Sequence, residues 1–391
     1  MRKAFKYKLY HNKKLQTLHG IIDAHAEIWN YCVAVSKRYY KIFNKSFNSY
    51  DLKKHITKLK KTKRYAHWKN LPSQSIQDVV ERIDKAYALF FLKLKAGDTE
   101  ARPPKFKPRK KYKSYTLKTA GYKLLDDNYG QIKIGKQVFR FFKSRDIKGE
   151  IKTCTIKRNS KGHVFIILSC EGNFLETPLP KTGHAVGLDW GMKCFITTSD
   201  ETHFPYPLFA YEAEKSIAEL NKQVEVAKKG TRKRRNLIKK LASLYEKVAN
   251  QRKDFHYKLA KQLVESYDEI FIENLSMDEL KKKPYFGKKV SDMAWDSFVQ
   301  ILNWMAIKYG KVVQKIDKWF PSSKRCSHCG HIKQDLSLKD RVYNCEKCEI
   351  SLDRDLNACY NILNEGKRIL NNKLDGASSS TCLITSENPP L

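Results

Sequence analysis

The chain has 391 residues, of which 77 are Lys or Arg and 41 are Asp or Glu, so its formal net charge is +36. An excess of this size opposes compaction unless a polyanion neutralises it, and no apolar run approaches the ~20 residues needed to span a bilayer. These properties exclude a membrane protein and favour nucleic acid as the partner; with no signal-peptide core at the N-terminus, we expect a cytoplasmic protein that associates with the nucleoid when on DNA.

The first hundred residues are predicted to form a strand followed by a helical module. Apolar and basic side chains alternate over residues 4–10, as in a half-buried strand with a basic outer face. From about residue 13 the apolar period becomes that of an amphipathic helix, and a second such helix begins near Ser73, after Pro72. We therefore assign residues 13–101 to a helical module.

The segment RPPKFKPRKKYKSY, residues 102–115, combines prolines with basic and aromatic residues. One interpretation is a solvated basic linker. The other is a nucleic-acid contact, in which basic side chains meet phosphates and aromatic rings stack on bases. The candidates for that contact are Lys105, Phe106, Lys107, Arg109, Lys110, Lys111 and Tyr112, with Lys113 and Tyr115.

Four short apolar runs with glycines between them follow, at residues 131–134, 138–142, 151–157 and 164–170. Several short strands at close spacing are typical of a small β-barrel, which the N-terminal strand can complete. The barrel would then comprise residues 1–12 and 102–180, with the helical module inserted into it.

Two apolar strands farther along the chain each carry an acid. Asp189 lies in AVGLDWG, residues 185–191, and Glu273 lies in YDEIFIENL, residues 267–275. A carboxylate in an apolar strand is costly unless a cation or hydrogen bonds compensate its charge. Both acids are therefore candidate metal ligands, with a cap or a surface ion pair as the alternative for either one alone.

The elements around these acids alternate between strand and helix. A helical pair is predicted over residues 208–267, with its turn at KKGTRKRR, and a helix over 290–309 precedes a strand at 311–316. This order indicates an α/β core over residues 181–318 and 350–370. The polar residues 371–391 are predicted to be a disordered tail.

Between the two parts of that core, residues 319–349 contain four regularly spaced cysteines: Cys326, Cys329, Cys345 and Cys348. Two Cys-x2-Cys pairs at this spacing are typical of a structural zinc ribbon, in which four thiolates close a tetrahedron around Zn²⁺. Two disulfides are the alternative, but nothing marks the chain as secreted. His328 or His331 could replace a cysteine, although the cysteines are better placed.

The third acid follows the ribbon, where apolar residues recur at helical spacing. Asp353 is predicted to cap this helix and Asp355 to be the functional acid. Together, Asp189, Glu273 and Asp355 would repel one another unless divalent cations bridged them, and carboxylate oxygens suit Mg²⁺ or Mn²⁺. Two such ions about 4 Å apart activate water and neutralise the leaving oxygen in phosphodiester hydrolysis.

These motifs together resemble the TnpB family, transposon-encoded nucleases related to compact type V CRISPR effectors. The resemblance covers about residues 2–365 and rests on GLDWG, FIENL, WFPSSKRCSHCG, RVYNCEKC and DRDLNACYNIL, and less specifically on KAFKYKLY, LPSQSIQ and PKFK. It implies a RuvC-like, RNase H-type nuclease core with a zinc ribbon insert, and an N-terminal β-barrel (wedge) domain carrying the helical recognition module. His11, Trp190 and Glu349 depart from the family pattern, the last where glycine is common.

The function implied by the resemblance is RNA-guided cleavage of DNA. A guide RNA from the transposon end would pair with one strand of target double-stranded DNA, while the protein reads a short flanking motif. By family position Ser73, Gln74 and Gln77 would contact that motif, with helix capping as their alternative role. We expect a monomer bound to one RNA, and the sequence leaves a dimer open.

Three other functions fit parts of the pattern. An RNA-guided repressor that no longer cuts would have lost at least one of the three acids, all of which are present. A DNA-strand transposase would need a nucleophilic Tyr or Ser arrangement that is not evident here. A compact type V CRISPR effector is a further alternative. The guide RNA, the flanking motif, the cut positions and the host do not follow from the sequence.

Overall fold

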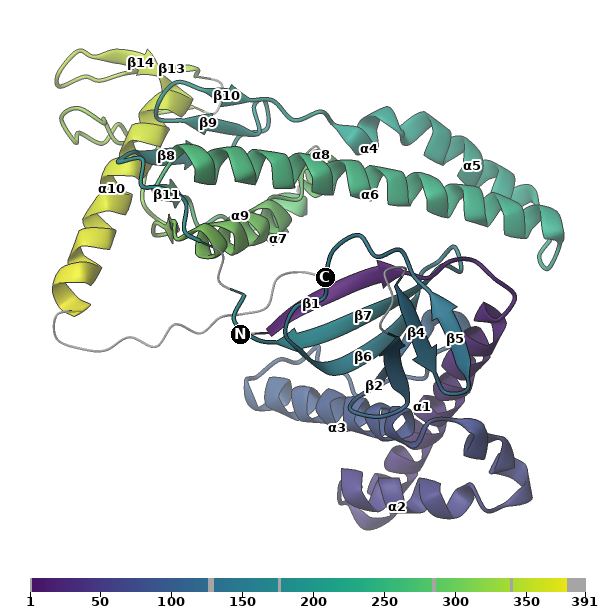
Figure 1. Cartoon of the computed structure of the whole chain (residues 1–391). Coiled ribbons are helices and arrows are strands. Elements are labelled where there is room, and N and C mark those ends of the chain that lie inside the picture. The colour runs from purple at the N-terminus through teal and green to yellow at the C-terminus, as the bar shows by residue number, and fades with distance from the viewer. Residues whose placement is uncertain (1, 126–129, 175–176, 283–285, 338–339, 378–391) are drawn as a thin grey trace. The chain divides into compact units, whose positions relative to one another are not determined.

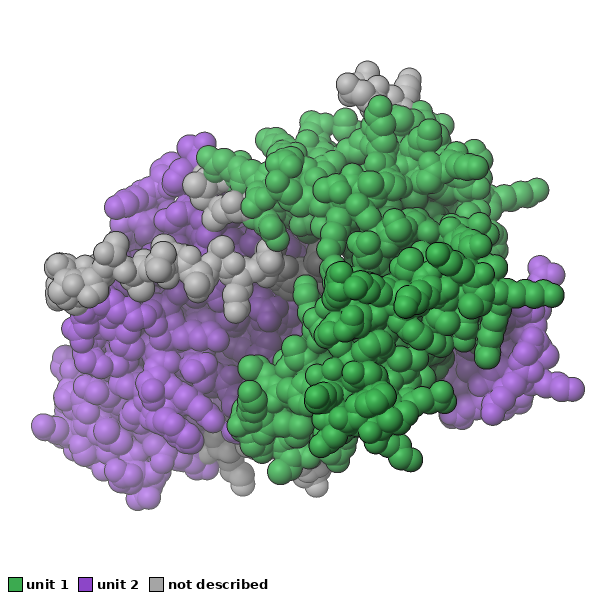
Figure 2. All heavy atoms as spheres, turned by 90° about the horizontal axis from the view of Figure 1, so that it is seen from below, with its two compact units in different colours: residues 1–174 green, residues 175–391 purple. Residues whose placement is uncertain are grey.

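The computed structural model describes residues 2–125, 130–174, 177–282, 286–337 and 340–377. The chain divides into two compact units, residues 1–174 and 175–391 (Figure 2). Each unit has a hydrophobic core of its own. None of the described helices is both long and apolar enough to cross a membrane.

The first unit combines antiparallel sheets with helices (Figure 1). The larger sheet has the strand order β1-β7-β6-β2 and the smaller one β3-β4-β5, and an isolated bridge between Leu9 and Phe141 links them. Its elements are β1 (Arg2–Lys8), α1 (Leu15–Phe43), α2 (Ser49–Leu59), the 3-10 segment Lys63–Asn70, α3 (Ser73–Lys95), the 3-10 turn Arg109–Lys111, β2 (Ser114–Leu117), β3 (Tyr122–Leu125), β4 (Gln131–Ile134), β5 (Gln137–Arg140), β6 (Glu150–Arg158) and β7 (Val164–Glu171).

The strands of this unit follow the alternation in the sequence. Phe5, Tyr7 and Leu9 are buried in the core, while Lys6 and Lys8 are exposed. The four strands predicted between residues 131 and 170 correspond to β4, β5, β6 and β7, with ends shifted by two residues or fewer. β2 and β3 were not predicted; β2 begins inside the basic segment, where prolines and lysines hide its alternation.

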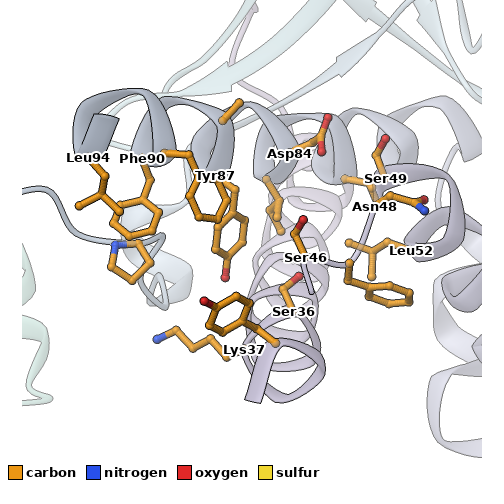
Figure 3. A pocket seen from close by; sticks show the side chains of 17 residues that line it. Ser36, Lys37, Ser46, Asn48, Ser49, Leu52, Asp84, Tyr87, Phe90 and Leu94 are labelled. Carbon is orange, nitrogen blue, oxygen red and sulfur yellow. The ribbon is translucent and has the colours of Figure 1, made fainter. Parts of the chain in front are cut away.

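The two predicted amphipathic helices are α1 and α3. In the first half of α3, Ile76, Val79 and Ile83 are buried, as the apolar stripe requires. Farther along, Tyr87, Phe90 and Leu94 line a largely apolar pocket of about 540 Å³, formed with α1 and the start of α2 (Figure 3). The second half of the stripe therefore borders a pocket instead of filling the core.

The second unit is built on a five-stranded sheet, with the strand order β10-β9-β8-β11-β12. β8, β11 and β12 run parallel, and β9 is antiparallel to β8. The elements are β8 (Ala185–Asp189), β9 (Ile196–Thr198), β10 (His203–Phe204), α4 (Phe209–Glu212), α5 (Glu214–Val226), α6 (Arg232–Ser266), β11 (Glu269–Ile272), α7 (Met277–Lys281), α8 (Gly287–Met293), α9 (Trp295–Tyr309), β12 (Val312–Lys315), β13 (Val342–Asn344), β14 (Ser351–Asp353) and α10 (Arg354–Ala377).

Helices cover both faces of this sheet. Val186, Leu188 and Ile270 pack with apolar residues of α6 and α9 in the main core. Phe271, from the opposite face, packs with Ile362 of α10. Figure 1 shows α10, in yellow, on the other side of β8 and β11 from α6 and α9. A parallel sheet buried on both faces explains why its strands read as nearly continuous apolar runs.

Two predicted boundaries in this unit are wrong. The single helix expected over residues 290–309 is two helices, because Ala294 adopts a left-handed conformation with φ 48° that ends α8 and begins α9. The tail expected from residue 371 begins too early, since α10 continues to Ala377; residues 378–391 lie outside the described residues. The predicted turn of the helical pair is confirmed, with Thr231 capping α6.

Candidate active site and metal centre

Two of the three predicted acids lie at the carboxyl edge of the sheet. Asp189 is the last residue of β8, and Glu273 directly follows β11. The two strands pair in parallel with Leu188 opposite Ile272, so the next residue of each strand, an acid in both cases, falls at the same level. Parallel pairing therefore accounts for their proximity.

The third acid is brought to this edge by α10, which lies directly on β8. A Cβ atom at Gly187 would be 2.1 Å from the carbonyl oxygen of Cys359, so only glycine allows this approach. The Cys359 thiol also donates to the carbonyl of Thr197 at 3.1 Å. Asp355 lies one helical turn before Cys359 and so on the same face of α10, beyond Gly187 towards the end of the strand.

The charges of the other two acids both act on Asp189. Burial, followed by the charges of Glu273 and Asp355, raises the pKa of Asp189 well above its usual range. Burial also raises the pKa of Glu273, which the hydrogen bond donated by Ser322 Oγ opposes. Like charges in a partly desolvated position are stabilised by a cation, and an all-oxygen donor set fits a hard divalent ion.

Asp353 and Asp355 have different roles at the start of α10. Asp353 Oδ1 accepts hydrogen bonds from the backbone N–H groups of Asp355 at 2.9 Å and Leu356 at 3.1 Å. This is the geometry of a helix cap, as predicted for Asp353. The Asp355 carboxylate takes no part in this cap, and its charge acts on Asp189.

The four cysteines of the ribbon form a cluster. Their sulfur atoms all lie within 4.8 Å of one another, and of the described residues they are the one group of metal-binding side chains gathered this closely. The Sγ atoms of Cys326 and Cys348 are 3.6 Å apart and those of Cys329 and Cys345 are 3.5 Å apart, so none is a disulfide. A tetrahedron of Zn–S bonds of about 2.3 Å places sulfurs roughly 3.8 Å apart, which these distances fit.

Two buried asparagines of α10 fasten the ribbon to the sheet, and the sequence analysis did not identify them. Asn357 donates to the carbonyl of Arg325 at 2.8 Å and accepts from the N–H of Ser327 at 2.9 Å. Asn361 donates to the carbonyls of Arg325 at 2.6 Å and Ser322 at 2.8 Å. The signal was present, because two asparagines four residues apart on an apolar helix face require partners.

The basic segment before β2 is held against α1. The indole N–H of Trp29 donates to the carbonyl of Lys105 at 3.0 Å, and the Asn30 amide bonds to both the N–H and the carbonyl of Lys107. The Lys107 ammonium also lies 3.6 Å from the centroid of the Trp29 ring. The interpretation as a free linker is therefore wrong.

The nucleic-acid candidates within this segment differ in accessibility. Phe106 is 56% exposed, Lys110 and Lys111 are exposed, and Arg109 forms an ion pair with Glu27. Tyr112 is only 4% exposed and belongs to the core, as does Tyr115. Base stacking by these two tyrosines is therefore ruled out, because their rings fill the space between the segment and α1.

The three predicted nucleic-acid contacts at the start of α3 also differ in how accessible their side chains are. Ser73 and Gln77 are exposed. The side-chain oxygen of Gln74 accepts hydrogen bonds from the backbone N–H groups of Lys118 and Ala120, and its side-chain NH2 group donates to Thr119 Oγ1. Gln74 thus holds the turn that follows β2, while contact of Ser73 and Gln77 with a flanking motif stays a prediction.

Family comparisons cover both the sheet and the ribbon. The family model OrfB_IS605, described as "Probable transposase", matches residues 163–283, which include Asp189 and Glu273. The model of the Cas12f1-like TNB domain matches residues 295–362, which include the four cysteines and Asp355. The three acids, the four cysteines and the two asparagines of α10 therefore all fall within regions shared with known families.

Sequence relatives decide the family. A candidate RNA-guided DNA endonuclease of Streptomyces pristinaespiralis is 30% identical over 318 residues, covering 80% of this chain and 76% of the relative. The chain belongs to the TnpB family. Another member, InsQ of Escherichia coli strain K12, also named as a candidate RNA-guided DNA endonuclease, is 26% identical and covers 77% of this chain and 76% of the relative. TnpB-like protein L79 of Acanthamoeba polyphaga mimivirus is 28% identical over 234 residues, or 55% of this chain and 43% of the relative.

The fold of this TnpB-family chain is shared with compact CRISPR effectors. A structure of the Cas12f1–sgRNA–target DNA complex matches with a TM-score of 0.56 at 13% identity, covering 93% of this chain and 99% of that chain. The mini-RNA-guided endonuclease CRISPR-Cas_phi3 matches with a TM-score of 0.57 at 8% identity, covering 94% and 92%. At these identities the likeness concerns the fold alone.

Proposed function

We propose that this chain is an RNA-guided DNA endonuclease that cuts its target by metal-dependent phosphodiester hydrolysis. The observations that support the proposal are the parallel pairing that brings Asp189 and Glu273 to one sheet edge, and the charge of Asp355, from α10, acting on Asp189. The sheet order supports a RuvC-like, RNase H-type core: β8 is central, with the antiparallel pair β9 and β10 on one side and the parallel strands β11 and β12 on the other. The names of the two bacterial relatives support the same activity.

The three carboxylates would hold Mg²⁺ or Mn²⁺. When bound, a pair of such ions supplies an activated water and neutralises the leaving oxygen. Ser322 orients the Glu273 carboxylate by its hydrogen bond. Asp353 caps the backbone N–H groups at the start of α10 and so holds the first turn of this helix in place.

The cysteine cluster would hold a structural Zn²⁺. All four ligands come from the protein, which leaves no open position for chemistry. The cluster instead shapes the loop from Ser322 to Ser327, which Asn357 and Asn361 attach to α10. Folding of the ribbon is therefore expected to depend on zinc, and the position of Ser322 to depend on the ribbon.

The partners would be a guide RNA and target double-stranded DNA. The formal charge of +36 suits a long polyanion, and the Cas12f1 structure that shares the fold contains both an RNA and a target DNA. Residues 1–12 and 102–180 would form the wedge and residues 13–101 the recognition module, with the nuclease core at 181–318 and 350–370 and the ribbon at 319–349. One chain would bind one RNA.

The test begins with the RNA that co-purifies with the protein. Its sequence supplies the guide, and the reconstituted complex is offered plasmids in which a matching target is followed by randomised DNA. Cleavage of one subset of plasmids in Mg²⁺, lost in Asp189→Ala, is expected. Target binding in a gel shift without any cut would instead identify a guided repressor.

A compact CRISPR effector is the second candidate, because the shared fold covers almost the whole of the Cas12f1 chain. The same RNA sequencing separates the two. A guide that continues from a transposon end supports the transposon-encoded enzyme, and a guide derived from repeat arrays supports the effector.

A further inference from the structure

One tryptophan beside the candidate active site is almost fully exposed. The sequence has six tryptophans, all among the described residues. Trp29, Trp68 and Trp295 are buried, Trp190 and Trp304 are half-buried, and Trp319 is 81% exposed. A tryptophan normally buries 150–250 Å² of surface, so a ring that leaves most of its apolar area exposed to solvent is unusual.

The backbone around Trp319 is fixed at both ends to the edge that carries the acids. Ile316 donates its N–H to the carbonyl of Ile272, the residue before Glu273, at 2.9 Å. Ser322 donates its hydroxyl to the Glu273 carboxylate. Trp319 lies three residues from each anchor, and three residues span at most about 11 Å. The Cα atom of Trp319 is therefore within about 11 Å of both anchors on the edge that carries Glu273.

The turn also holds Trp319 in a defined place. Its N–H donates to Asp317 Oδ1 at 2.8 Å, and the Phe320 N–H donates to the Asp317 carbonyl at 3.3 Å. The Lys318 ammonium lies 4.8 Å from the Trp319 ring centroid and 3.3 Å from a Glu279 carboxylate oxygen. An exposed ring held by its own backbone needs little ordering before it binds.

The surroundings favour a negatively charged, aromatic ligand. The stretch KIDKWFPSSKR, residues 315–325, contains four Lys or Arg and one Asp. Aromatic rings beside basic residues bind single-stranded nucleic acid, since any base can stack and the phosphates meet the cations. A paired base within a duplex does not offer its face in this way.

We propose that Trp319 is a stacking platform for an unpaired base of the DNA strand presented to the three acids. This rests on the proposed function, to which it adds one residue that positions the substrate strand. The ring would hold the strand a few nucleotides from the scissile phosphate. Trp319 would thus position the substrate without contacting the reacting atoms.

The test measures binding of a 15-nucleotide oligothymidine to the full chain carrying Asp355→Ala, with no added Mg²⁺. Trp319→Ala is expected to weaken this binding about fivefold or more, and Trp319→Phe to retain most of it. Binding should also quench tryptophan fluorescence, and that quenching should disappear in Trp319→Phe. Tyr211→Ala, which removes a ring that is 70% exposed on α4, is the matched control and should leave affinity unchanged.

An abasic oligomer of equal length separates stacking from phosphate contacts and from misfolding. Trp319→Ala should bind it as tightly as the parent; an equal loss on both oligomers, or no loss on oligothymidine, overturns the proposal. Guided plasmid cleavage tells failure of the proposed function apart from failure of the Trp319 inference. Failure of the unmodified chain to cut with its own guide defeats the proposed function, whereas unchanged cutting and oligothymidine binding by Trp319→Ala defeat this inference alone.

Discussion

Asp353 accepts a hydrogen bond from the backbone N–H of Asp355 at 2.9 Å, so two acids only two residues apart have separate functions. We expect Asp355→Ala to reduce guided cleavage more than 100-fold while leaving target binding within twofold, because a metal ligand is lost. Asp353→Ala should keep cleavage and cost about 1 kcal/mol of unfolding free energy, as for other caps. Plasmid cleavage and urea unfolding measure the two effects, and the reverse pattern would make Asp353 the ligand.

Ser322 connects the ribbon to the active-site edge through its hydrogen bond to Glu273. Removing the hydroxyl in Ser322→Ala should lower cleavage at limiting Mg²⁺ by 10- to 100-fold, the usual effect of losing a group that orients a metal ligand. Binding of Mn²⁺ to the protein without DNA, followed by calorimetry, should weaken in parallel. Ser323→Ala changes the neighbouring serine and is the control; equal losses in both variants would point to a general disturbance of the loop.

Metal removal should separate the two centres. EDTA is expected to stop cleavage, and excess Mg²⁺ to restore it, because the carboxylate site exchanges with solvent. Cys326→Ser should lower the zinc content, measured by atomic absorption, together with the yield of folded protein, because structural zinc contributes folding free energy. Normal zinc content in this variant would contradict the assigned ligand set.

Glu349, which follows the second cysteine pair, adopts a left-handed conformation with φ 57°. Gly330, at the equivalent position after the first pair, is also left-handed, with φ 77°, but as a glycine it tolerates this conformation. A non-glycine residue in this region costs about 1 kcal/mol, so Glu349→Gly should stabilise the ribbon by about that amount. The midpoint of thermal unfolding checks it. Glu349→Ala removes the charge but keeps the backbone cost, and stabilisation equal to that of glycine would show that charge, not conformation, is responsible.

His256 makes stability depend on pH. Burial lowers the pKa of His256 to about 4. The nearby Arg252 charge lowers this pKa further, whereas the hydrogen bond with the Met293 carbonyl raises it. Because the unfolded value is about 6.5, the unfolded chain takes up the proton first, and stability present above that pH is lost as pH falls towards 4. At pH 5 the loss is about 2 kcal/mol. Urea unfolding at pH 7.5 and 5 should show this loss, and His256→Phe should reduce it by about that amount, because buried His25, whose pKa is also lowered to about 4, keeps its own contribution.

Local patterns in the sequence predicted much of this protein. The alternation around Phe5, the cysteine spacing, and the acids at positions 189, 273 and 355 all depend on residues close in the chain or on strand order. The parallel pairing that juxtaposes the first two acids follows from the alternation of strands and helices. These elements needed no knowledge of distant contacts.

What failed depends on contacts between segments far apart. Tyr112 was predicted to stack on bases because it stands among lysines, but the docking of its segment on Trp29 and Asn30 places its ring in the core. The roles of Asn357 and Asn361 depend on a loop more than thirty residues earlier. The break at Ala294 has no glycine or proline to announce it.

Gly187 carries no charge and no functional group, yet the approach of α10 to β8 depends on it. A single methyl group there would push the helix outward and carry Asp355 away from Asp189, with every ionisable side chain still present. If the chain is the proposed nuclease, Gly187→Ala is therefore expected to give a protein that binds guide and target without cutting. The electrostatic attraction for nucleic acid would be untouched.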